Sequence, residues 1–490
     1  MSEMKSLAKD TAIYGLSSII GKFLNYLLVP LYTYVLARTE DYGIVTNLYA
    51  WTALLLVILT YGMETGFFRF ANREDRDPNV VYRTAFLTLL ASSTLFAVVC
   101  VFFREPIANG MGYAGHAEFI AMMAVTVAMD AFASIPFAYL RYKKRPILFA
   151  ALKILFVALN IGFNLLFLVV LKKNDVVYVF VSNILATAIQ TACLLPFTMP
   201  RGGRFSWTVL HEMLSYSLPL LILGVAGIMN QTLDRIVFPY LYPGEDAQAQ
   251  LGIYGACFKV AMVMMMFTQA FRYAYEPFVF AKHKDRQSVE AYADAMKYYV
   301  IFSLLILLGV IFYLDIFRYI ISSHYWEGLK IVPVVLWTYV FQGVYFNLSF
   351  WYKLTDETRW GAYFSLIGLV ITLVLQIVGV PRIGYWASCG SSLICYLCIM
   401  LLSYFIGQKR APIPYDLRCI GRYTLLTIVL LAAYYLPIYL LGIENMWAHM
   451  GIGTVLLCIY IYVLTKRDFP IRDYIYVFRN RRNHGSSRQD

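Results

Sequence analysis

Apolar runs of roughly twenty residues recur along the whole chain, and they constrain its fold more than any other feature. A run of this length crosses the hydrocarbon core of a bilayer as a single helix. We find about fourteen such runs, at 11–36, 42–66, 83–103, 117–140, 147–171, 176–199, 213–240, 251–278, 297–321, 328–352, 361–380, 384–407, 420–442 and 446–465. The sequence therefore predicts an all-α polytopic membrane protein with about 14 transmembrane helices.

Composition and loop charge support this topology. Of the 490 residues, 60% are hydrophobic and 14% are charged, whereas a soluble chain has about 25% charged residues. Lys and Arg stay on the cytoplasmic side of a membrane, and alternate loops carry 29 basic residues against 6 in the others. Both termini are therefore expected to be cytoplasmic. The net charge of +12 is explained by topology and by anionic membrane lipids, so no nucleic-acid partner is predicted.

The sequence contains no pattern typical of an enzyme or a metalloprotein. The connections between the runs are too short to hold a soluble domain. The histidines fall in loops, tails or span ends, and neither HExxH nor GxSxG occurs. Seven of the 8 cysteines lie inside predicted spans, which argues against a disulfide framework. We therefore expect no catalytic residue, no metal site and no cofactor.

A weak internal repeat suggests how the spans are grouped. Aligning 41–71 with 250–281 places Gly43 on Gly252 and Ile44 on Ile253, near the start of the second helix of each set of six. Two bundles with the same even number of spans are related by an axis along the membrane normal, with a substrate site between them. The predicted domains are a six-helix bundle at 1–205, a second at 206–410, two further helices at 411–465, and a basic cytoplasmic tail at 466–490.

Ionisable residues inside the predicted spans are the candidates for function. A charge at the centre of a bilayer costs about 3 kcal/mol or more, so it needs a partner, a wet cavity or a short reach to the interface. Lys22 and Asp130 lie near mid-span, and Asp234, Arg235 and Lys259 lie one to two turns from the outer face. An internal ion pair that ties helices together is the alternative explanation for these five.

Helical spacing favours a cavity. Lys22 and Asn25 share one face of the first run, Asn230 and Asp234 share a face of the seventh, and Lys259 and Gln269 share a face of the eighth. Glu64 and Glu276 lie nearer the cytoplasmic ends, where a side chain that reaches the interface is the alternative. Glu276 can also pair with Arg272 at i,i+4.

Six segments in order resemble the polysaccharide-export branch of the multidrug, oligosaccharidyl-lipid and polysaccharide (MOP) exporter superfamily, the Wzx-like O-unit flippases. They are LAKDTAIYGLSSIIGKFLNYLLVPLYTYVL, EDYGIVTNLYAW, IPFAYLRYKKRP, LDRIVFPYL, GIYGACFKVA and HYWEGLKIVPVVLW. The resemblance runs from about residue 5 to residue 407, and their order and spacing carry it. It implies a MATE-like fold of two six-helix bundles plus two C-terminal helices.

The resemblance also implies a function. A lipid-linked oligosaccharide, on an undecaprenyl-diphosphate carrier, would be turned from the inner to the outer leaflet of the bacterial inner membrane by alternating access. Lys22, Arg235 and Lys259 would hold the diphosphate. Sugars would meet amide and aromatic side chains, namely Asn25, Tyr26, Asn230, Gln231, Gln269 and Tyr273. Asp130, Asp234, Glu64 and Glu276 are the candidates for ion coupling, through H⁺, Na⁺ or the membrane potential. A polysaccharide polymerase and chain-length proteins are the expected protein partners.

Three alternatives remain open at this point. A lipid II flippase for peptidoglycan also has about fourteen spans. A multidrug exporter of the same superfamily would favour an anionic cavity, whereas this chain mixes basic with acidic residues. A membrane-embedded polysaccharide polymerase or ligase would need a large outer loop, and the outer loops here are short.

Overall fold

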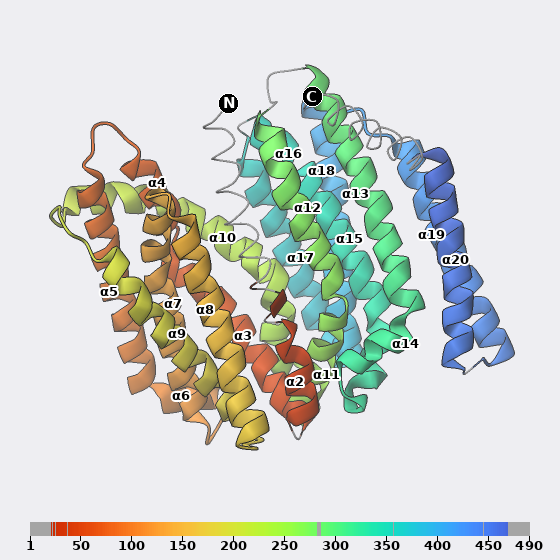
Figure 1. The fold of residues 1–490 in the computed structure, drawn as a ribbon, viewed down its shortest axis with the longest axis horizontal. Coiled ribbons are helices and arrows are strands. Elements are labelled where there is room, and N and C mark those ends of the chain that lie inside the picture. Colours follow the sequence, from red (N-terminus) through yellow and green to blue (C-terminus); the bar gives the residue numbers. More distant parts are fainter. Residues whose placement is uncertain are drawn as a thin grey trace, which may run out of the picture. The chain divides into compact units, whose positions relative to one another are not determined.

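The computed structural model describes residues 21, 23–24, 26–36, 38–281, 286–355, 357–443 and 445–468, and every regular element in these ranges is a helix (Figure 1). The elements are α2 (Leu28–Val35), α3 (Thr39–Thr60), α4 (Met63–Ala71), α5 (Pro78–Phe102), α6 (Arg104–Gly110), α7 (Ala117–Tyr142), α8 (Pro146–Asn164), η1 (Leu165–Val170), α9 (Val177–Thr198), α10 (Trp207–Leu241), α11 (Ala247–Val260), α12 (Met262–Ala281), α13 (Arg286–Phe312), α14 (Leu314–Phe317), η2 (Arg318–Ile320), η3 (Ser323–Ile331), α15 (Val332–Leu348), α16 (Phe350–Leu354), α17 (Arg359–Ile383), α18 (Tyr385–Arg410), α19 (Leu417–Leu441) and α20 (Met446–Arg467). The predicted all-α fold is confirmed.

The predicted spans have helical counterparts in the same order. Within the described residues, 12 helical segments are long and apolar enough to cross a membrane, and the bent pair α11 and α12 makes a thirteenth. These correspond to the second through the fourteenth predicted spans. The first predicted span, 11–36, lies largely outside the described residues, and α2 covers its end. The multi-pass membrane fold is therefore confirmed, with fourteen as an approximate count.

Short polar signals set where several helices begin. Asp77, directly before Pro78, accepts a hydrogen bond from the backbone of Asn79 at 2.9 Å and starts α5. Side-chain oxygens start three more helices in the same way: Ser206 at α10, Asp416 at α19 and Asn445 at α20. Such caps satisfy backbone N–H groups that the first helical turn leaves without partners.

The helices form two compact units. The first comprises Met1–Ala281 and Ile320–Pro412, and the second comprises Lys282–Tyr319 and Ile413–Asp490. The repeat in the sequence places α13 in the bundle at 206–410, whereas its contacts group it with α19 and α20. Grouping by contact does not address descent by duplication, so the division at 205 and 410 stays a prediction.

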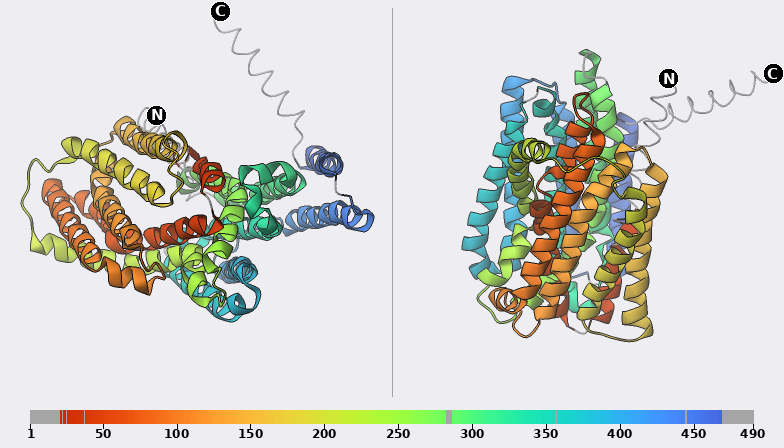
Figure 2. Two further views of the ribbon diagram at one scale, coloured as in Figure 1. Left: turned by 90° about the horizontal axis from the view of Figure 1, so that it is seen from below. Right: turned by 90° about the vertical axis from the view of Figure 1, so that its left-hand side faces the viewer.

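The first unit contains two sets of helices that α10 joins. We call α2–α9 with η1 the N-lobe, and α10–α12, η3 and α15–α18 the C-lobe. Seen from below in Figure 2, the N-lobe helices, red to yellow, gather in a bundle of their own. Helix α10 runs obliquely from beside α4 and α5 to beside α17 (Figure 1). Its two ends therefore pack on different lobes.

Glycines bring α3 and α11 together at the end predicted to face outside. A Cβ on Gly43 would lie 1.8 Å from the carbonyl oxygen of Gln248, and one on Gly252 would lie 2.0 Å from that of Thr39. Gly43 and Gly252 are the two positions that the repeat alignment equates. Small residues allow helix backbones to approach this closely inside a membrane, so this crossing links the lobes through equivalent positions.

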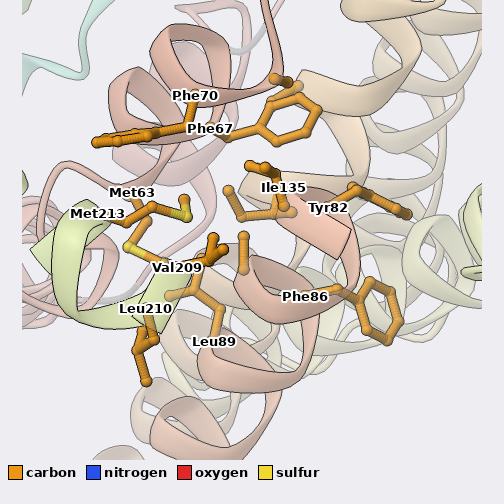
Figure 3. Packing of buried hydrophobic residues seen from close by; sticks show 14 of the residues in the cluster. Met63, Phe67, Phe70, Tyr82, Phe86, Leu89, Ile135, Val209, Leu210 and Met213 are labelled. Atoms are coloured by element: carbon orange, nitrogen blue, oxygen red, sulfur yellow. The ribbon is translucent and has the colours of Figure 1, made fainter. Parts of the chain in front are cut away.

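Aromatic side chains pack the N-lobe against the first half of α10. Met63, Phe67 and Phe70 of α4 meet Tyr82, Phe86 and Leu89 of α5, Ile135 of α7, and Val209, Leu210 and Met213 of α10 (Figure 3). The ring of Tyr82 stacks on that of Tyr139 with centroids 4.0 Å apart, and its hydroxyl donates to the carbonyl of Thr198. This cluster fixes the start of α10, whose other half carries the candidate site.

The second unit is a bundle of α13, α19 and α20 that polar contacts hold at several levels. At one end, Asp468 lies 3.1 Å from the Lys297 ammonium and accepts a hydrogen bond from the Tyr423 hydroxyl at 2.8 Å. At the other end, Nδ1 of His449 lies 2.7 Å from a carboxylate oxygen of Asp315. Between them, the Tyr460 hydroxyl donates to the carbonyl of Ile301 at 2.8 Å.

Candidate substrate-binding site

Two cavities lie in the first unit, one on each side of the junction between the lobes. The C-lobe chamber has a volume of about 310 Å³ and is lined by Ala53, Ile228, Asn230, Gln231, Thr232, Arg235, Phe258, Lys259, Met262, Met265, Thr268, Gln269, Arg272, Thr338, Tyr339, Gln342, Phe346, Ser392 and Tyr396. The N-lobe chamber has a volume of about 330 Å³ and is lined by Leu28, Val29, Tyr32, Tyr42, Val45, Thr46, Tyr49, Ala50, Ala53, Phe156, Asn160, Asn183, Thr232, Arg235, Gly255 and Lys259. Both volumes fall within the range of small-ligand sites, about 300–1,000 Å³.

The chambers share a wall that carries two positive charges. Ala53, Thr232, Arg235 and Lys259 line both cavities. Arg235 comes from α10 and Lys259 from the last turn of α11, so the two charges come from different helices. No acidic side chain lines either chamber among the residues that the structure describes. The shared wall is therefore suited to an anion.

Contacts on three sides hold the Arg235 side chain. Its Nε lies 3.4 Å from a carboxylate oxygen of Asp234, and its guanidinium carbon lies 4.6 Å from the centre of the Phe258 ring. A terminal nitrogen donates to the carbonyl of Gln231. An arginine has five N–H donors in a planar fork, and these contacts leave donors on the chamber side. Arg235 is therefore positioned and still able to bind a ligand.

Asp234 lies behind this wall. Its side chain is 4% exposed and lines neither chamber. The hydroxyl of Tyr254, which is fully buried, donates to Asp234 at 2.5 Å. The carboxylate therefore balances and orients Arg235 and does not contact the cavity contents.

The N-lobe also positions the backbone at Arg235. Asn47 of α3 donates from its amide nitrogen to the carbonyl of Arg235 at 2.7 Å. The Tyr113 hydroxyl donates to the Asn47 amide oxygen, also at 2.7 Å. Asn47 is 1% exposed, so its geometry is fixed by packing. Two consecutive hydrogen bonds, from Tyr113 to Asn47 and from Asn47 to the Arg235 carbonyl, thus connect the N-lobe to Arg235.

Lys259 occupies the point where the eighth span bends. Helices α11 and α12 meet at a 48° angle, with Ala261 between them. Among the described residues, none forms a hydrogen bond or an ion pair with the Lys259 ammonium. An ammonium at membrane depth requires water or a counter-charge. Lys259 is therefore a cation that needs water or an anionic ligand beside it.

The structure brings together five of the residues predicted from the sequence. Arg235, Lys259, Asn230, Gln231 and Gln269 line the C-lobe chamber. The amide nitrogen of Asn230 donates to the carbonyl of Ser365 at 2.8 Å, while its buried oxygen has no hydrogen-bond partner within the described part of the chain.

The other predicted residues lie elsewhere or outside the described residues. Lys22 and Asn25 fall outside them, as do the side chains of Tyr273 and Glu276. The carboxylate of Glu64 accepts a hydrogen bond from Arg141 and lines neither chamber. Asp130 lies within electrostatic range of Lys153, whose ammonium is 3.9 Å from the centre of the Phe137 ring, and neither residue lines a chamber. Their roles in ion coupling stay predictions.

Sequence reasoning missed much of the N-lobe chamber. Asn160 and Asn183 are buried or half-buried amides inside predicted spans, and an intramembrane polar residue is a candidate for function by the same argument as a charge. That signal was available in the sequence. Tyr32, Tyr42 and Tyr49 carried no comparable signal, because 17% of this chain is aromatic. Within the described residues, no group of His, Cys, Asp and Glu could hold a metal ion.

The stretch of sequence that contains most of this site also matches a known protein family. Residues 35–331 match the family described as "Polysaccharide biosynthesis protein", over more than half of the chain. The chain belongs to this family. The matched range includes Arg235, Lys259 and most of both chambers. No curated protein matches the sequence.

Solved structures share the fold of this family member at low sequence identity. A structure titled "Lipid II flippase MurJ, inward closed conformation" superposes with a TM-score of 0.72 at 14% identity, covering 92% of this chain and 99% of the other. An inward-facing multidrug resistance MATE family transporter of the MOP superfamily gives 0.64 at 12% identity, covering 84% and 95%. A MOP superfamily transporter from Pyrococcus furiosus, whose title reports a binding pocket of reverse polarity, gives 0.54 at 14% identity, covering 82% and 95%. The chain therefore has the fold of the MurJ and MATE structures, and the family match confirms the predicted polysaccharide biosynthesis family.

Proposed function

We propose that this protein moves a lipid-linked oligosaccharide on a prenyl-diphosphate carrier from the inner to the outer leaflet of a bacterial cytoplasmic membrane. It would act as a transporter and not as an enzyme, for the assembly of O-antigen or a related surface polysaccharide. Both termini would lie in the cytoplasm, and the chambers would open alternately to the two sides. The observation that carries this proposal is the wall that the chambers share, with Arg235 and Lys259 and no described acidic lining residue.

The diphosphate headgroup is the part of such a substrate that is most costly to transfer from water into the membrane. Its negative charges lose water on entering the membrane, and only cationic or strongly donating groups can replace that water. Arginine binds phosphate through paired N–H groups, and lysine binds it as a point charge. Arg272, on α12 of the C-lobe chamber and 4.8 Å from the centre of the Phe346 ring, extends the cationic surface.

The charge of the chambers also separates the alternatives. A cationic drug would need acidic lining residues, and none is present among the described ones. A lipid II-type precursor carries a diphosphate as well, and the MurJ structure covers nearly the whole chain, so it is the second candidate. Coupling to H⁺, Na⁺ or the membrane potential is part of the proposal, with Asp130 and Asp234 as candidate residues.

Binding of a short-chain prenyl diphosphate to the purified protein in nanodiscs tests the anion site directly. We expect Arg235→Gln and Lys259→Gln each to weaken binding by about tenfold or more, since a hydrogen bond to a charged group contributes about 1.5–3 kcal/mol. Lys153→Gln is the matched control, because it removes a membrane-embedded lysine that lines neither chamber. Wild-type affinity in the Arg235→Gln, Lys259→Gln double variant would contradict the proposal.

Complementation then tests transport. In cells that lack their own O-unit flippase, we expect the wild-type gene to restore surface polysaccharide. Lys22→Ala, Arg235→Gln and Lys259→Gln should abolish this restoration at equal membrane protein levels. Restoration of lipid II export in cells depleted of that activity would instead favour the second candidate.

A further inference from the structure

The two chambers differ in charge beyond the wall that they share. The C-lobe chamber adds Arg272 to the shared Arg235 and Lys259. The N-lobe chamber adds no charged side chain among its described lining residues. A ligand that bridges the chambers would therefore place its anionic part at the shared wall and toward the C-lobe. The part that enters the N-lobe chamber would be uncharged.

The N-lobe chamber is nevertheless polar. The hydroxyl of Tyr49 accepts a hydrogen bond from the Asn183 amide at 2.8 Å. The amide oxygen of Asn160 accepts one from Asn164 at 3.1 Å, and among the described residues none accepts a hydrogen bond from the Asn160 amide nitrogen. The Tyr32 hydroxyl is buried and lacks a well-formed hydrogen bond within the described residues. Donors and acceptors thus remain available on this wall.

These polar groups are held in place before any ligand arrives. Asn160 is 4% exposed, and Tyr32 and Tyr42 are 5% and 3% exposed. The Tyr42 ring meets that of Tyr325 edge to face, with centroids 5.9 Å apart. Because packing already fixes these side chains, a ligand loses little affinity to their ordering. The polar side chains of the N-lobe chamber are therefore preorganised for ligand binding.

The lining also narrows the chemical class of the occupant. A prenyl chain would leave the Asn160 amide nitrogen without an acceptor, and the Tyr32 hydroxyl without a well-formed hydrogen bond, among the described residues, which is costly. A cation would meet Arg235 and Lys259 and no described acid. A neutral ring with several hydroxyl groups meets both requirements, because its C–H faces pack on aromatic rings while its hydroxyls bond to amides.

We propose that the N-lobe chamber is a recognition site for one neutral sugar ring, the one attached to the diphosphate of the carrier. This inference rests on the function proposed above and assigns a subsite within it. The volume of about 330 Å³ lies near the lower limit for small-ligand sites, about 300 Å³, and so suits one ring and not a whole oligosaccharide. The remaining sugars would extend beyond the chamber.

The test compares two kinds of ligand on the protein in nanodiscs. The first is a short-chain prenyl diphosphate, and the second is the same carrier bearing one glucose, galactose or N-acetylglucosamine. We expect at least one of the sugar-bearing carriers to bind about tenfold more tightly than the bare carrier. Tyr49→Phe and Asn160→Leu should reduce that ratio to about one while leaving the affinity for the bare carrier unchanged. Equal binding of all carriers by the wild type, or an unchanged ratio in both variants, would overturn the inference.

Two further variants separate specific loss from damage to the fold. Gln190→Leu removes a buried amide on α9 that donates to the carbonyl of Leu152 at 2.9 Å and lines neither chamber. We expect it to keep the wild-type ratio, and a ratio of one in this variant would count against a sugar site. Arg235→Gln should weaken binding of both kinds of carrier. If the wild type binds no prenyl diphosphate at all, the proposed function fails, which is distinct from failure of the sugar subsite alone.

Discussion

At the scale of the residue, the candidate site depends on which charges are already neutralised. Asp234 and Arg235 are neighbours in sequence, but only Arg235 lines the chambers. Asp234 is enclosed and engaged by Tyr254, whereas Arg235 reaches both chambers. Lys259 has no partner among the described residues. The positive charge offered to a ligand therefore comes from Lys259 and from the N–H groups of Arg235 that Asp234 does not engage.

Removing the Asp234 carboxylate should destabilise the protein more than removing the Tyr254 hydroxyl that donates a hydrogen bond to it. Asp234→Asn leaves a largely buried guanidinium without its counter-charge, which costs about 3 kcal/mol. Tyr254→Phe removes one hydrogen bond to a charged group, about 1.5 kcal/mol, and keeps the ion pair. Thermal melting of both variants in detergent measures which one loses more stability. A larger loss for Tyr254→Phe would show that Asp234 does not balance Arg235.

At the scale of the element, the crossing of α3 and α11 decides how the lobes meet. The two helices approach so closely because Gly43 and Gly252 have no side chains at the contact. The same helices carry chamber residues farther along, including Tyr49 on α3 and Lys259 on α11. The geometry of the crossing therefore sets the distance between the walls of the N-lobe chamber.

A single methyl group at this crossing should separate the helices. In Gly43→Ala, the new Cβ would lie 1.8 Å from a backbone oxygen, which no side-chain rotation can relieve. We expect a loss of about 1–3 kcal/mol from overpacking and weaker prenyl-diphosphate binding. Gly162→Ala on α8 is the matched control, because nothing lies within 4 Å of its Cβ position. Equal melting temperatures for the two variants would contradict a tight crossing.

At the scale of the whole molecule, the chain forms two compact units, each with its own stabilising contacts. The first unit encloses both chambers and is held by the aromatic cluster of Figure 3 and the glycine crossing. The second unit combines buried apolar side chains, such as Leu304 and Phe312, with polar contacts at Asp468. Although burial alone raises the pKa of Asp468, its bonds to the Tyr423 hydroxyl and the Lys297 ammonium hold that pKa below its usual range.

The second unit should therefore depend on pH through Asp468. A lowered pKa in the folded state stabilises the fold fully above the ordinary aspartate pKa of about 4, and this stabilisation is lost as the pH falls below it. We expect Asp468→Asn to cost about 1–2 kcal/mol at neutral pH, with the difference from the wild type narrowing toward pH 4 and below. Melting curves of the wild type and Asp468→Asn between neutral pH and about pH 4 measure this difference. Asp294→Asn, at an exposed position on α13, should leave stability unchanged at every pH.

Local properties of the chain were predictable from its sequence. The spans were found because helix length and apolarity belong to each segment by itself. Arg235, Lys259, Asn230 and Gln269 were found because a polar group in an apolar segment is costly wherever its neighbours lie. The glycines at 43 and 252 were equated by the repeat, although nothing in the sequence showed that they touch.

The sequence by itself thus determined a multi-pass helical membrane protein and the charges available to a substrate. Only the tertiary structure decided that Arg141 engages Glu64, that Asp234 lies behind Arg235, and that α13 packs with α19 and α20. It also decided that tyrosines and amides of the N-lobe line a chamber that shares Arg235 and Lys259 with the C-lobe chamber. The physical reason is that the partner of a side chain depends on which helix faces pack together, and that packing joins residues far apart in the chain.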